Sequence, residues 1–244
     1  MSEKIRVLVN GAKGRMGLEI VNTVIDAEDL VLAGETDLGD DLEKIIADSK
    51  SDVVVDFTSP HCAYENAQKI CASAAAGVIG TTGFTLVQVQ SLVDKSKGKK
   101  PGIIIAPNFA IGALLMMHCA RICAKYMPDV EIIELHHDKK LDAPSGTAIK
   151  TAEMISEVRK DVSTRIFESG VRGKLYSDIP LHSIRLPGLL AHQEVIFGAA
   201  GQTLTLRHDS INRSCFMPGV LLAIRQVINI EGLVYGLDKL LFKE

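Results

Sequence analysis

The feature that most constrains this chain is a regular alternation of short apolar runs and helix-like segments over its first hundred residues. Residues 5–9 are a β-branched apolar run that stops at Asn10-Gly11, and residues 16–25 follow with apolar side chains at helical spacing. Runs that are apolar throughout are typical of strands buried on both faces of a parallel sheet. Further strands are expected at 30–33, 53–56, 77–80 and 102–106, and further helices at 41–49, 61–76 and 84–95. The alternation predicts an α/β fold with a doubly wound parallel sheet.

The pattern of expected strands and helices changes after Asn108. A long apolar helix is expected at 111–126, followed by an alternating strand at 130–135 and a helix at 147–160. Further strands are expected at 179–186, 193–197 and 203–208, before a final amphipathic helix at 216–229. The strand-rich middle predicts a second, α+β domain with a mixed sheet. We therefore predict two domains, one from 1–106 with 216–244 and one from 107–215.

Composition excludes several classes of protein. The net charge is −3 with no basic block, and there is no Trp, so a nucleic-acid partner is not expected. No stretch approaches the roughly 18 apolar residues of a membrane span, and the N-terminal apolar run is too short for a signal peptide. The five cysteines include no CxxC pair, and Cys119 and Cys123 lie one helical turn apart in an apolar segment. This pattern favours buried thiols in a reducing cytoplasm.

A glycine-rich loop lies between the first expected strand and the first expected helix. Its glycines, Gly11, Gly14 and Gly17, have the spacing GxxGxxG rather than GxGxxG. Glycine permits a tight turn and a close backbone approach to phosphate, and the following helix N-terminus favours an anion. Many βα turns use glycine for geometry alone. The position after a clear strand, with Asp37 about 20 residues further along, favours a Rossmann-type dinucleotide site.

Asp37 also bears on the choice of cofactor. A carboxylate accepts hydrogen bonds from an adenosine 2′-hydroxyl and repels a 2′-phosphate. Its neighbour Leu38 offers no positive charge, so NADH should bind well, and NADPH should be tolerated if Lys13 or another cation reaches the phosphate. Glu35 is a rival carboxylate, although it could equally be a solvated loop residue.

More loops follow the carboxyl ends of the expected parallel strands, where folds of this kind bind ligands. Their sequences are DFTSP at 56–60, GTTGF at 80–84 and APNF at 106–109. Each could be an ordinary turn, but three such ends on one sheet predict a shared crevice.

Residues 134–150, ELHHDKKLDAPSGTAIK, gather titratable groups where a strand gives way to a helix. Because side chains alternate along a strand, His136 and His137 should point to opposite sides, so only one is expected to be chemical. Lys140 could neutralise a carboxylate, whereas Lys139 is interpreted as surface charge.

The turn that follows predicts a helix N-terminus. Ser145 or Asp142 could cap the helix, and the backbone N–H groups of Gly146 and Thr147 would form an anion-binding nest. A metal site is not favoured, because adjacent strand histidines diverge and no third ligand stands at a familiar spacing. A Ser145 nucleophile is not favoured either, because no GxSxG elbow surrounds it. The segment is typical of a site for a small anionic substrate beside a proton donor.

These motifs resemble those of the 4-hydroxy-tetrahydrodipicolinate (dihydrodipicolinate) reductase family. ELHHDKKLDAPSGTA is similar to the family signature, and GAKGRMG, DFTSP, VIGTTGF, IAPNFAIGA, LAHQEVIFG and RHDSINRSCFMPGVLLA follow the family order across the whole chain. A compact region between Asp37 and Val53 resembles the short form of the family. Asp138-Lys139 occupy the two variable positions of the signature, which leaves cofactor preference and pH optimum open.

The resemblance implies a cytoplasmic NAD(P)H-dependent reductase of the diaminopimelate route to lysine. It would reduce 4-hydroxy-tetrahydrodipicolinate to tetrahydrodipicolinate and release water, with hydride going to C4 of the substrate before protonation of the enamine. Residues 1–106 and 216–244 would bind the dinucleotide, and residues 107–215 would bind substrate and form a homotetramer.

The resemblance also carries site roles over, position by position. The cofactor-binding residues would be Gly11, Ala12, Arg15 and Met16 at the pyrophosphate, Asp37 at the ribose, and Gly80, Thr81, Thr82, Ala106, Asn108 and Phe109 on the nicotinamide side. The catalytic residues would be His136, as proton donor, and Lys140, and the substrate-binding residues would be His137, Gly146 and Thr147. A substrate-bound water is an alternative proton donor. Another Rossmann oxidoreductase acting on amino-acid-like substrates, or a dinucleotide-sensing module, remains the rival hypothesis.

Overall fold

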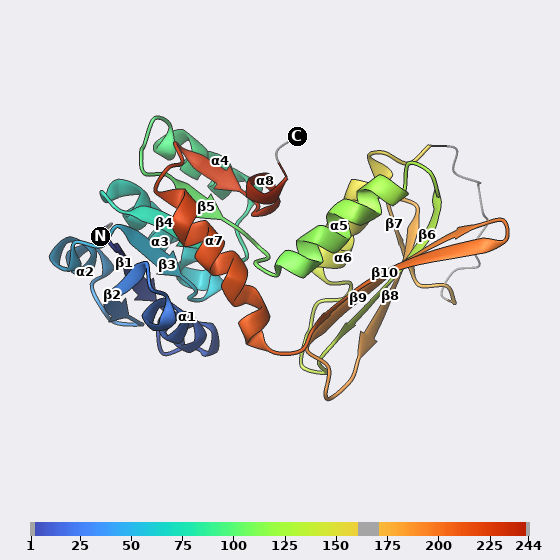
Figure 1. Cartoon of the computed structure of the whole chain (residues 1–244), viewed down its shortest axis with the longest axis horizontal. Helices are drawn as coiled ribbons and strands as arrows, with labels where there is room; N and C mark the ends of the chain where they lie inside the picture. The colour runs from blue at the N-terminus through green and yellow to red at the C-terminus, as the bar shows by residue number, and fades with distance from the viewer. Residues whose placement is uncertain (1–2, 161–170, 243–244) are drawn as a thin grey trace. The chain divides into compact units, whose positions relative to one another are not determined.

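The computed structural model describes residues 3–160 and 171–242, which divide into two compact units (Figure 1). Unit 1 comprises Met1–Ala110 and Phe216–Glu244, and unit 2 comprises Ile111–Cys215. The first boundary between the units therefore falls after Ala110, four residues later than the expected boundary after residue 106. No helix among the described residues is long and apolar enough to span a membrane.

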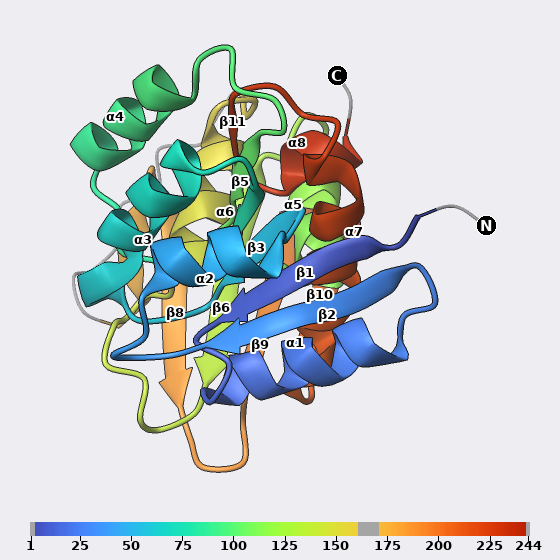
Figure 2. The same ribbon diagram turned by 90° about the vertical axis from the view of Figure 1, so that its left-hand side faces the viewer.

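The described residues of unit 1 form a parallel sheet of six strands in the order β11-β5-β4-β3-β1-β2 (Figure 2). The chain runs outward from β1 in both directions, which confirms the predicted doubly wound sheet. Its strands are β1 (Ile5–Asn10), β2 (Leu30–Thr36), β3 (Val53–Asp56), β4 (Ala76–Ile79), β5 (Ile103–Ile105) and β11 (Leu233–Tyr235). Strands β3, β4 and β5 are buried along their whole length, as uninterrupted apolar runs require.

Helices cover both faces of this sheet (Figure 2). Helices α1 and α7 pack against each other and on one face, whereas α2, α3 and α4 follow one another on the opposite face. The helices of unit 1 are α1 (Arg15–Asp26), α2 (Leu42–Ser49), α3 (Pro60–Ala72), α4 (Leu86–Ser96), α7 (Met217–Val227) and α8 (Asp238–Leu241). The sequence did not predict β11 or α8, because both are too short to show a period.

Helix α3 ends at Ala72, four residues before the predicted end at 76. The amine of Lys99 caps this end of the helix, where it donates to the carbonyl oxygens of Ile70, Cys71 and Ser73 at 3.0, 2.8 and 2.6 Å. The last carbonyl oxygens of a helix receive no N–H group from a further turn, and a cation beside them interacts favourably with the helix dipole.

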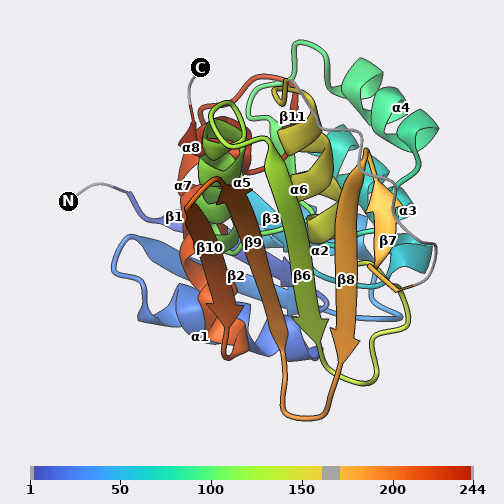
Figure 3. The ribbon, with the colours of Figure 1, turned by 90° about the vertical axis from the view of Figure 1, so that its right-hand side faces the viewer.

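The described residues of unit 2 form a mixed sheet of five strands in the order β10-β9-β6-β8-β7 (Figure 3). Strand β6 runs parallel to β8 and antiparallel to β9, so the predicted mixed sheet is confirmed. The elements are α5 (Ile111–Cys123), β6 (Asp129–His136), α6 (Gly146–Ser156), β7 (Lys174–Tyr176), β8 (Ile179–Arg185), β9 (Ala191–Ala199) and β10 (Gln202–Ser210). A 3-10 turn, Arg213–Phe216, precedes α7.

Helices α5 and α6 cover one face of the mixed sheet. On β6 the residues Val130, Ile132 and Glu134 are buried, while the alternate positions are only partly buried. The opposite face of the sheet is therefore more accessible within this chain, and its side chains include Ile133 and Ile196. Helices α5 and α6 end three or four residues before the predicted positions 126 and 160.

The expectation of buried thiols was wrong for most of the cysteines. All five are free, but only Cys71 is buried, and Cys119 is exposed. Helix α5 buries a stripe that includes Ala113, Met116 and Ala120, and Cys119 lies outside that stripe. The helix is apolar nearly all round, so its sequence did not reveal which side would be covered.

Candidate functional site

The glycine loop is a tight turn that glycine alone can form. Gly11 has φ +84°, and a Cβ added there would lie 2.6 Å from the carbonyl oxygen of Phe57. A Cβ on Gly17 would lie 2.0 Å from the carbonyl oxygen of Gly11, so helix α1 can approach the loop only without a side chain there. The first and third glycines of the motif therefore serve the turn and the packing of the helix on it.

Several N–H groups of this loop already have acceptors within the fold. Gly11 and Ala12 donate to the carbonyl oxygen of Thr36 at 2.8 and 3.1 Å. Helix α1 begins at Arg15, and its N-cap residue Gly14 contributes no side-chain cap. The first N–H groups of a helix have no partner within it, so the start of α1, at Arg15 and Met16, is the part of the loop suited to an anion.

Asp37 follows β2 and is tied to the same loop. Its carboxylate accepts N–H groups from Lys13 and Leu38, both at 2.8 Å. These two hydrogen bonds, that from Leu38 first, hold the pKa of Asp37 below its ordinary value, so the group is charged at neutral pH. Leu38 beside it is 96% exposed, a large apolar side chain at the place where an adenosine is expected.

A buried carboxyl group, Asp56, joins three of the loops that the sequence placed at the edge of the sheet. Its oxygens accept from the side chains of Asn10 (2.6 Å), Asn66 (2.9 Å), Thr58 (2.9 Å) and Thr81 (2.9 Å). The Thr81 hydroxyl also accepts the N–H of Thr58 at 2.9 Å. Asp56 thus holds the loops after β1, β3 and β4 in one arrangement.

The other residues expected on the nicotinamide side differ in accessibility. Thr82 is exposed and Gly80 is partly exposed, whereas Ala106 and Phe109 are buried. The ring of Phe109 lies 5.3 Å from that of Phe57, and a Cβ on Gly80 would lie 2.1 Å from the Phe57 ring. Asn108 accepts the N–H of Ala110 at 2.9 Å and so shapes its own turn. The buried members can offer a ligand only their backbone.

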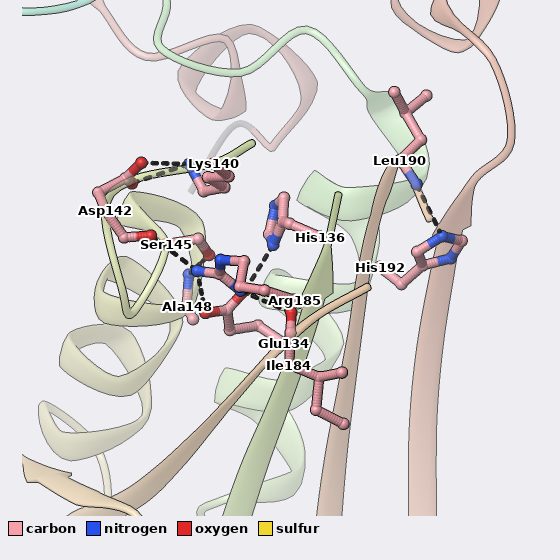
Figure 4. Close-up of polar contacts among 10 residues, drawn as sticks. All are labelled: Glu134, His136, Lys140, Asp142, Ser145, Ala148, Ile184, Arg185, Leu190 and His192. Carbon is pink, nitrogen blue, oxygen red and sulfur yellow. Dashed lines mark hydrogen bonds and ion pairs between the residues drawn. The ribbon is translucent and has the colours of Figure 1, made fainter. Parts of the chain in front are cut away.

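In unit 2, His136 ends β6 and its Nδ1 contacts the carboxylate of Glu134, two residues earlier on the same strand (Figure 4). Glu134 is completely buried. Arg185, on the neighbouring strand β8, binds it through both terminal nitrogens, at 2.8 and 2.9 Å. Burial opposes ionisation, but hydrogen bonds from His136, Arg185 and Ser183 outweigh it and lower the pKa of Glu134 to about 2.

The ionised Glu134 fixes the proton on the histidine ring. A carboxylate can only accept hydrogen bonds, so Nδ1 of His136 carries a proton, and Nε2 is the ring nitrogen left for other partners. His136 is therefore held by a carboxylate in the manner of a histidine prepared for proton transfer.

Lys140 lies in the loop after β6, opposite Asp142 (Figure 4). Its amine donates to both oxygens of Asp142 at 2.8 Å. Burial raises the pKa of Asp142, but the hydrogen bond from Lys140 outweighs it, so the pKa of Asp142 lies below its ordinary value. Arg185 also donates to the carbonyl oxygen of Asp142 at 2.7 Å, which ties the loop to the Glu134–His136 pair.

The predicted helix N-terminus is present at α6. Ser145 is the cap, since its hydroxyl accepts the N–H of Ala148 at 3.2 Å, and Asp142 is not. Gly146 and Thr147 are the first two residues of the helix. A Cβ on Gly146 would meet no atom within 4 Å in the described chain, so packing does not require glycine there. The helix start is thus accessible at Gly146.

His137 is partly buried and its carbonyl oxygen accepts the N–H of Lys140 at 3.1 Å, which forms the turn of the loop. Lys139 is exposed, in keeping with its interpretation as surface charge. Among the described residues no group of three His, Cys, Asp or Glu side chains could hold a metal ion.

Three residues of this arrangement were given no site role by the sequence-based prediction: Glu134, Arg185 and Asp56. Glu134 could have been found, because it occupies a buried position in the alternation of Val130 and Ile132, where a charge needs a partner. Arg185 as that partner could not, because the pairing of β6 with β8 joins residues 51 positions apart.

The comparisons with known proteins agree across both units. The family models for dihydrodipicolinate reductase match residues 5–109 (N-terminus) and 112–241 (C-terminus). A 4-hydroxy-tetrahydrodipicolinate reductase of Coxiella burnetii is 51% identical over 97% of this chain and 99% of its own length, and one of Listeria welshimeri is 48% identical over 97% and 100%. A solved structure, dipicolinate-bound dihydrodipicolinate reductase from Paenisporosarcina, superposes with a TM-score of 0.86 at 46% identity, covering 97% of this chain and 99% of that one.

Proposed function

The chain belongs to the dihydrodipicolinate reductase family, and we propose that it reduces 4-hydroxy-tetrahydrodipicolinate to tetrahydrodipicolinate with NAD(P)H, releasing water, in the diaminopimelate route to lysine. The observation that carries the proposal is a histidine whose Nδ1 is bound to a buried carboxylate, next to a lysine and an accessible helix N-terminus. A cyclic dicarboxylate that needs one proton during its reduction fits this set of groups.

The residues of unit 2 account for binding and protonation. The start of α6, at Gly146 and Thr147, would hold one substrate carboxylate through backbone N–H groups and the helix dipole. Lys140 has three N–H donors, of which two go to Asp142 within the described chain, and the third would go to substrate. His137 would contribute to the same carboxylates.

His136 is proposed as the proton donor. Its Nε2 would take up a proton from solvent as the dianionic substrate binds and would then give that proton to the enamine. The carboxylate of Glu134 would stabilise the doubly protonated, positive ring in between. Dehydration gives the substrate a conjugated imine, and a bound nicotinamide would supply the hydride to its C4.

Unit 1 fits a dinucleotide. The uncapped start of α1 at Arg15 and Met16 suits a pyrophosphate, with Gly11 and Ala12 forming the turn beneath it. Asp37 would bind the adenosine ribose. Gly80, Thr81 and Thr82, with Ala106, Asn108 and Phe109, would lie on the nicotinamide side.

We expect NADH to bind well, because Asp37 is charged and would repel a 2′-phosphate. The exposed side chains of Lys13 and Arg15 are the cations that could make NADPH acceptable. Steady-state kinetics with each cofactor at saturating substrate would measure the preference.

A homotetramer formed through the mixed sheet is proposed on the same grounds. The sheet face opposite α5 and α6 carries partly buried apolar residues such as Ile133 and Ile196. Sedimentation analysis would test it, because Ile196→Asp should lower the mass of the assembly relative to that of the native protein. The free thiols and the use of NAD(P)H favour a cytoplasmic location.

The deciding experiment is a coupled assay with dihydrodipicolinate synthase. Oxidation of NADH or NADPH should begin only when the synthase product is supplied. Absence of oxidation with either cofactor would exclude the proposed reaction and favour another Rossmann oxidoreductase or a dinucleotide-sensing module.

A further inference from the structure

The ion pair of the buried Glu134 with the partly buried Arg185 lies beside groups to which the proposed function gives chemical roles. Glu134 has no exposed surface, yet it is charged, and a charge in that position is costly unless it is paired and hydrogen-bonded. An apolar side chain would continue the pattern of Val130 and Ile132 on this face of β6. Replacement of a buried ion pair by apolar groups is often neutral or stabilising, so stability alone is a weak reason for this pair.

We propose that Glu134 and Arg185 are positioning residues for the reduction. Glu134 holds the His136 ring with its proton on Nδ1 and with Nε2 toward substrate. Arg185 holds the loop that carries Lys140 and Asp142 against the carboxylate of Glu134. The inference rests on the proposed function, to which it adds two residues that need not touch substrate.

The hydrogen bonds of Arg185 connect the two halves of this arrangement (Figure 4). The guanidinium binds both oxygens of Glu134, the carbonyl oxygen of Ile184 at 2.8 Å and the carbonyl oxygen of Asp142 at 2.7 Å. Asp142 in turn binds Lys140. One planar group thus sets the distance between the strand end that carries His136 and the loop that carries Lys140. A lysine could supply the charge but not this planar fork.

The register of the sheet places the pair. In the parallel pairing of β6 with β8, Glu134 lies opposite Ser183 and His136 lies opposite Arg185. Arg185 therefore reaches back to Glu134 across the two strands, beside the ring that Glu134 holds. The geometry follows from strand pairing, so it does not depend on a ligand.

The first variant is Glu134→Gln, which keeps the shape of the side chain and removes its charge. We expect kcat to fall roughly 10- to 1,000-fold, with the KM for NADH nearly unchanged. Losses of this order are expected when the group that orients a metal ligand or a catalytic histidine is replaced. Arg185→Lys should instead weaken binding of pyridine-2,6-dicarboxylate and raise the substrate KM, because the loop that carries Lys140 loses its hydrogen bond from Arg185 to the Asp142 carbonyl oxygen.

The chain offers a matched control in Glu131. It lies on the same strand and likewise binds an arginine and a histidine, Arg172 and His182, but on the opposite face of the sheet. Glu131→Gln should leave both kcat and the pyridine-2,6-dicarboxylate affinity close to those of the native enzyme. A general effect of removing an ion pair from β6 would affect both variants alike.

A second readout needs no substrate, so it separates this inference from the proposed reaction. Nitrogen-15 NMR of the histidine rings should place the His136 proton on Nδ1 in the native protein and in Glu131→Gln. In Glu134→Gln the proton should be shared between the two ring nitrogens. A native spectrum with Nδ1 unprotonated, an unchanged spectrum in Glu134→Gln, or a kcat loss below about threefold in that variant would overturn the proposal.

Glu134→Gln leaves the partly buried Arg185 without a carboxylate partner and could fail to fold. In that case the double variant Glu134→Gln/Arg185→Met, which removes both charges, replaces the single variant in the experiment. The same loss of kcat and the same change in the ring spectrum are expected. If neither variant folds, the native spectrum decides the assignment.

Discussion

Two buried carboxyl groups organise the two units, and they are held in opposite ways. In unit 1, Asp56 accepts hydrogen bonds from neutral amides and hydroxyls among the described residues. In unit 2, Glu134 is held by a guanidinium and an imidazole. Both groups join a strand end to a loop, but the donors that hold Asp56 are neutral, whereas Glu134 has two ionisable partners.

The difference teaches where each unit needs charge. The loops around Asp56 are expected to receive a cofactor through backbone groups, so neutral donors suffice to fix their shape. The loop around Glu134 is expected to receive a dianion and to move a proton, so its groups must keep defined charges. Four substitutions test this contrast, and they follow in order of decreasing expected effect.

The largest effect is expected at Lys140, on the charged side of the comparison. Lys140→Ala should lower kcat by roughly two to four orders of magnitude, because charge stabilisation and the orientation of substrate are both impaired. The coupled assay measures it. Lys139→Ala removes an exposed neighbour of the same charge and should change kcat less than about twofold. A loss below about tenfold in Lys140→Ala would count against its catalytic role and favour a sensing module.

The next effect concerns stability in acid and distinguishes the two carboxyl groups directly. The pKa of Glu134 is about 2 in the folded chain against an ordinary value of 4.5. A lowered pKa contributes stability that is present above pH 4.5 and is lost as the pH falls toward 2, on the order of 3 kcal/mol. Urea unfolding of the native chain and of Glu134→Gln between pH 7 and about 3 should therefore give converging free energies. Parallel curves would show that Glu134 is not held by charge.

A smaller effect is expected for Asp56→Asn. The amide keeps one acceptor, and the hydroxyls of Thr58 and Thr81 can turn to accept from the new N–H group, so the loss of unfolding free energy at pH 7 should be about 1–2 kcal/mol. Urea unfolding beside Glu134→Gln measures the contrast. A loss for Asp56→Asn that exceeds that of Glu134→Gln would reverse the comparison.

The fourth effect, expected at Asp37 in unit 1, is about as small as the third and concerns cofactor binding rather than stability. Asp37→Ala should weaken NADH binding by about 1–2 kcal/mol, as expected for the loss of a hydrogen bond to a charged acceptor. Fluorescence titration of NADH measures the affinity, and Glu35→Ala is the control that should leave it unchanged. An unchanged affinity in Asp37→Ala would assign the ribose to Glu35 or to the backbone.

The sequence predicted the elements that depend on local pattern. The apolar runs of β3 and β5 and the alternation of β6 are visible without a structure, and Ser145 was a sound candidate for the cap of α6. The pairings that hold the candidate site were not visible, because they join residues far apart in the chain. Glu134 with Arg185 spans 51 positions, and Asn10 with Asp56 spans 46. Side-chain burial on α5 was missed for a related reason, since a helix that is apolar all round does not show which side will be covered.

Unit 1 is assembled from two separate stretches of chain. Strand β11 pairs with β5 at one edge of the parallel sheet, and α7 covers one of its faces, yet both follow unit 2 in the sequence. A ribosome therefore releases the first five strands well before the elements that complete their sheet. Until then β5 presents an unpaired edge and an uncovered apolar face, the features that recruit chaperones or promote aggregation. Unit 2, whose residues are contiguous, can fold during that interval, so synthesis should complete the second unit before the first.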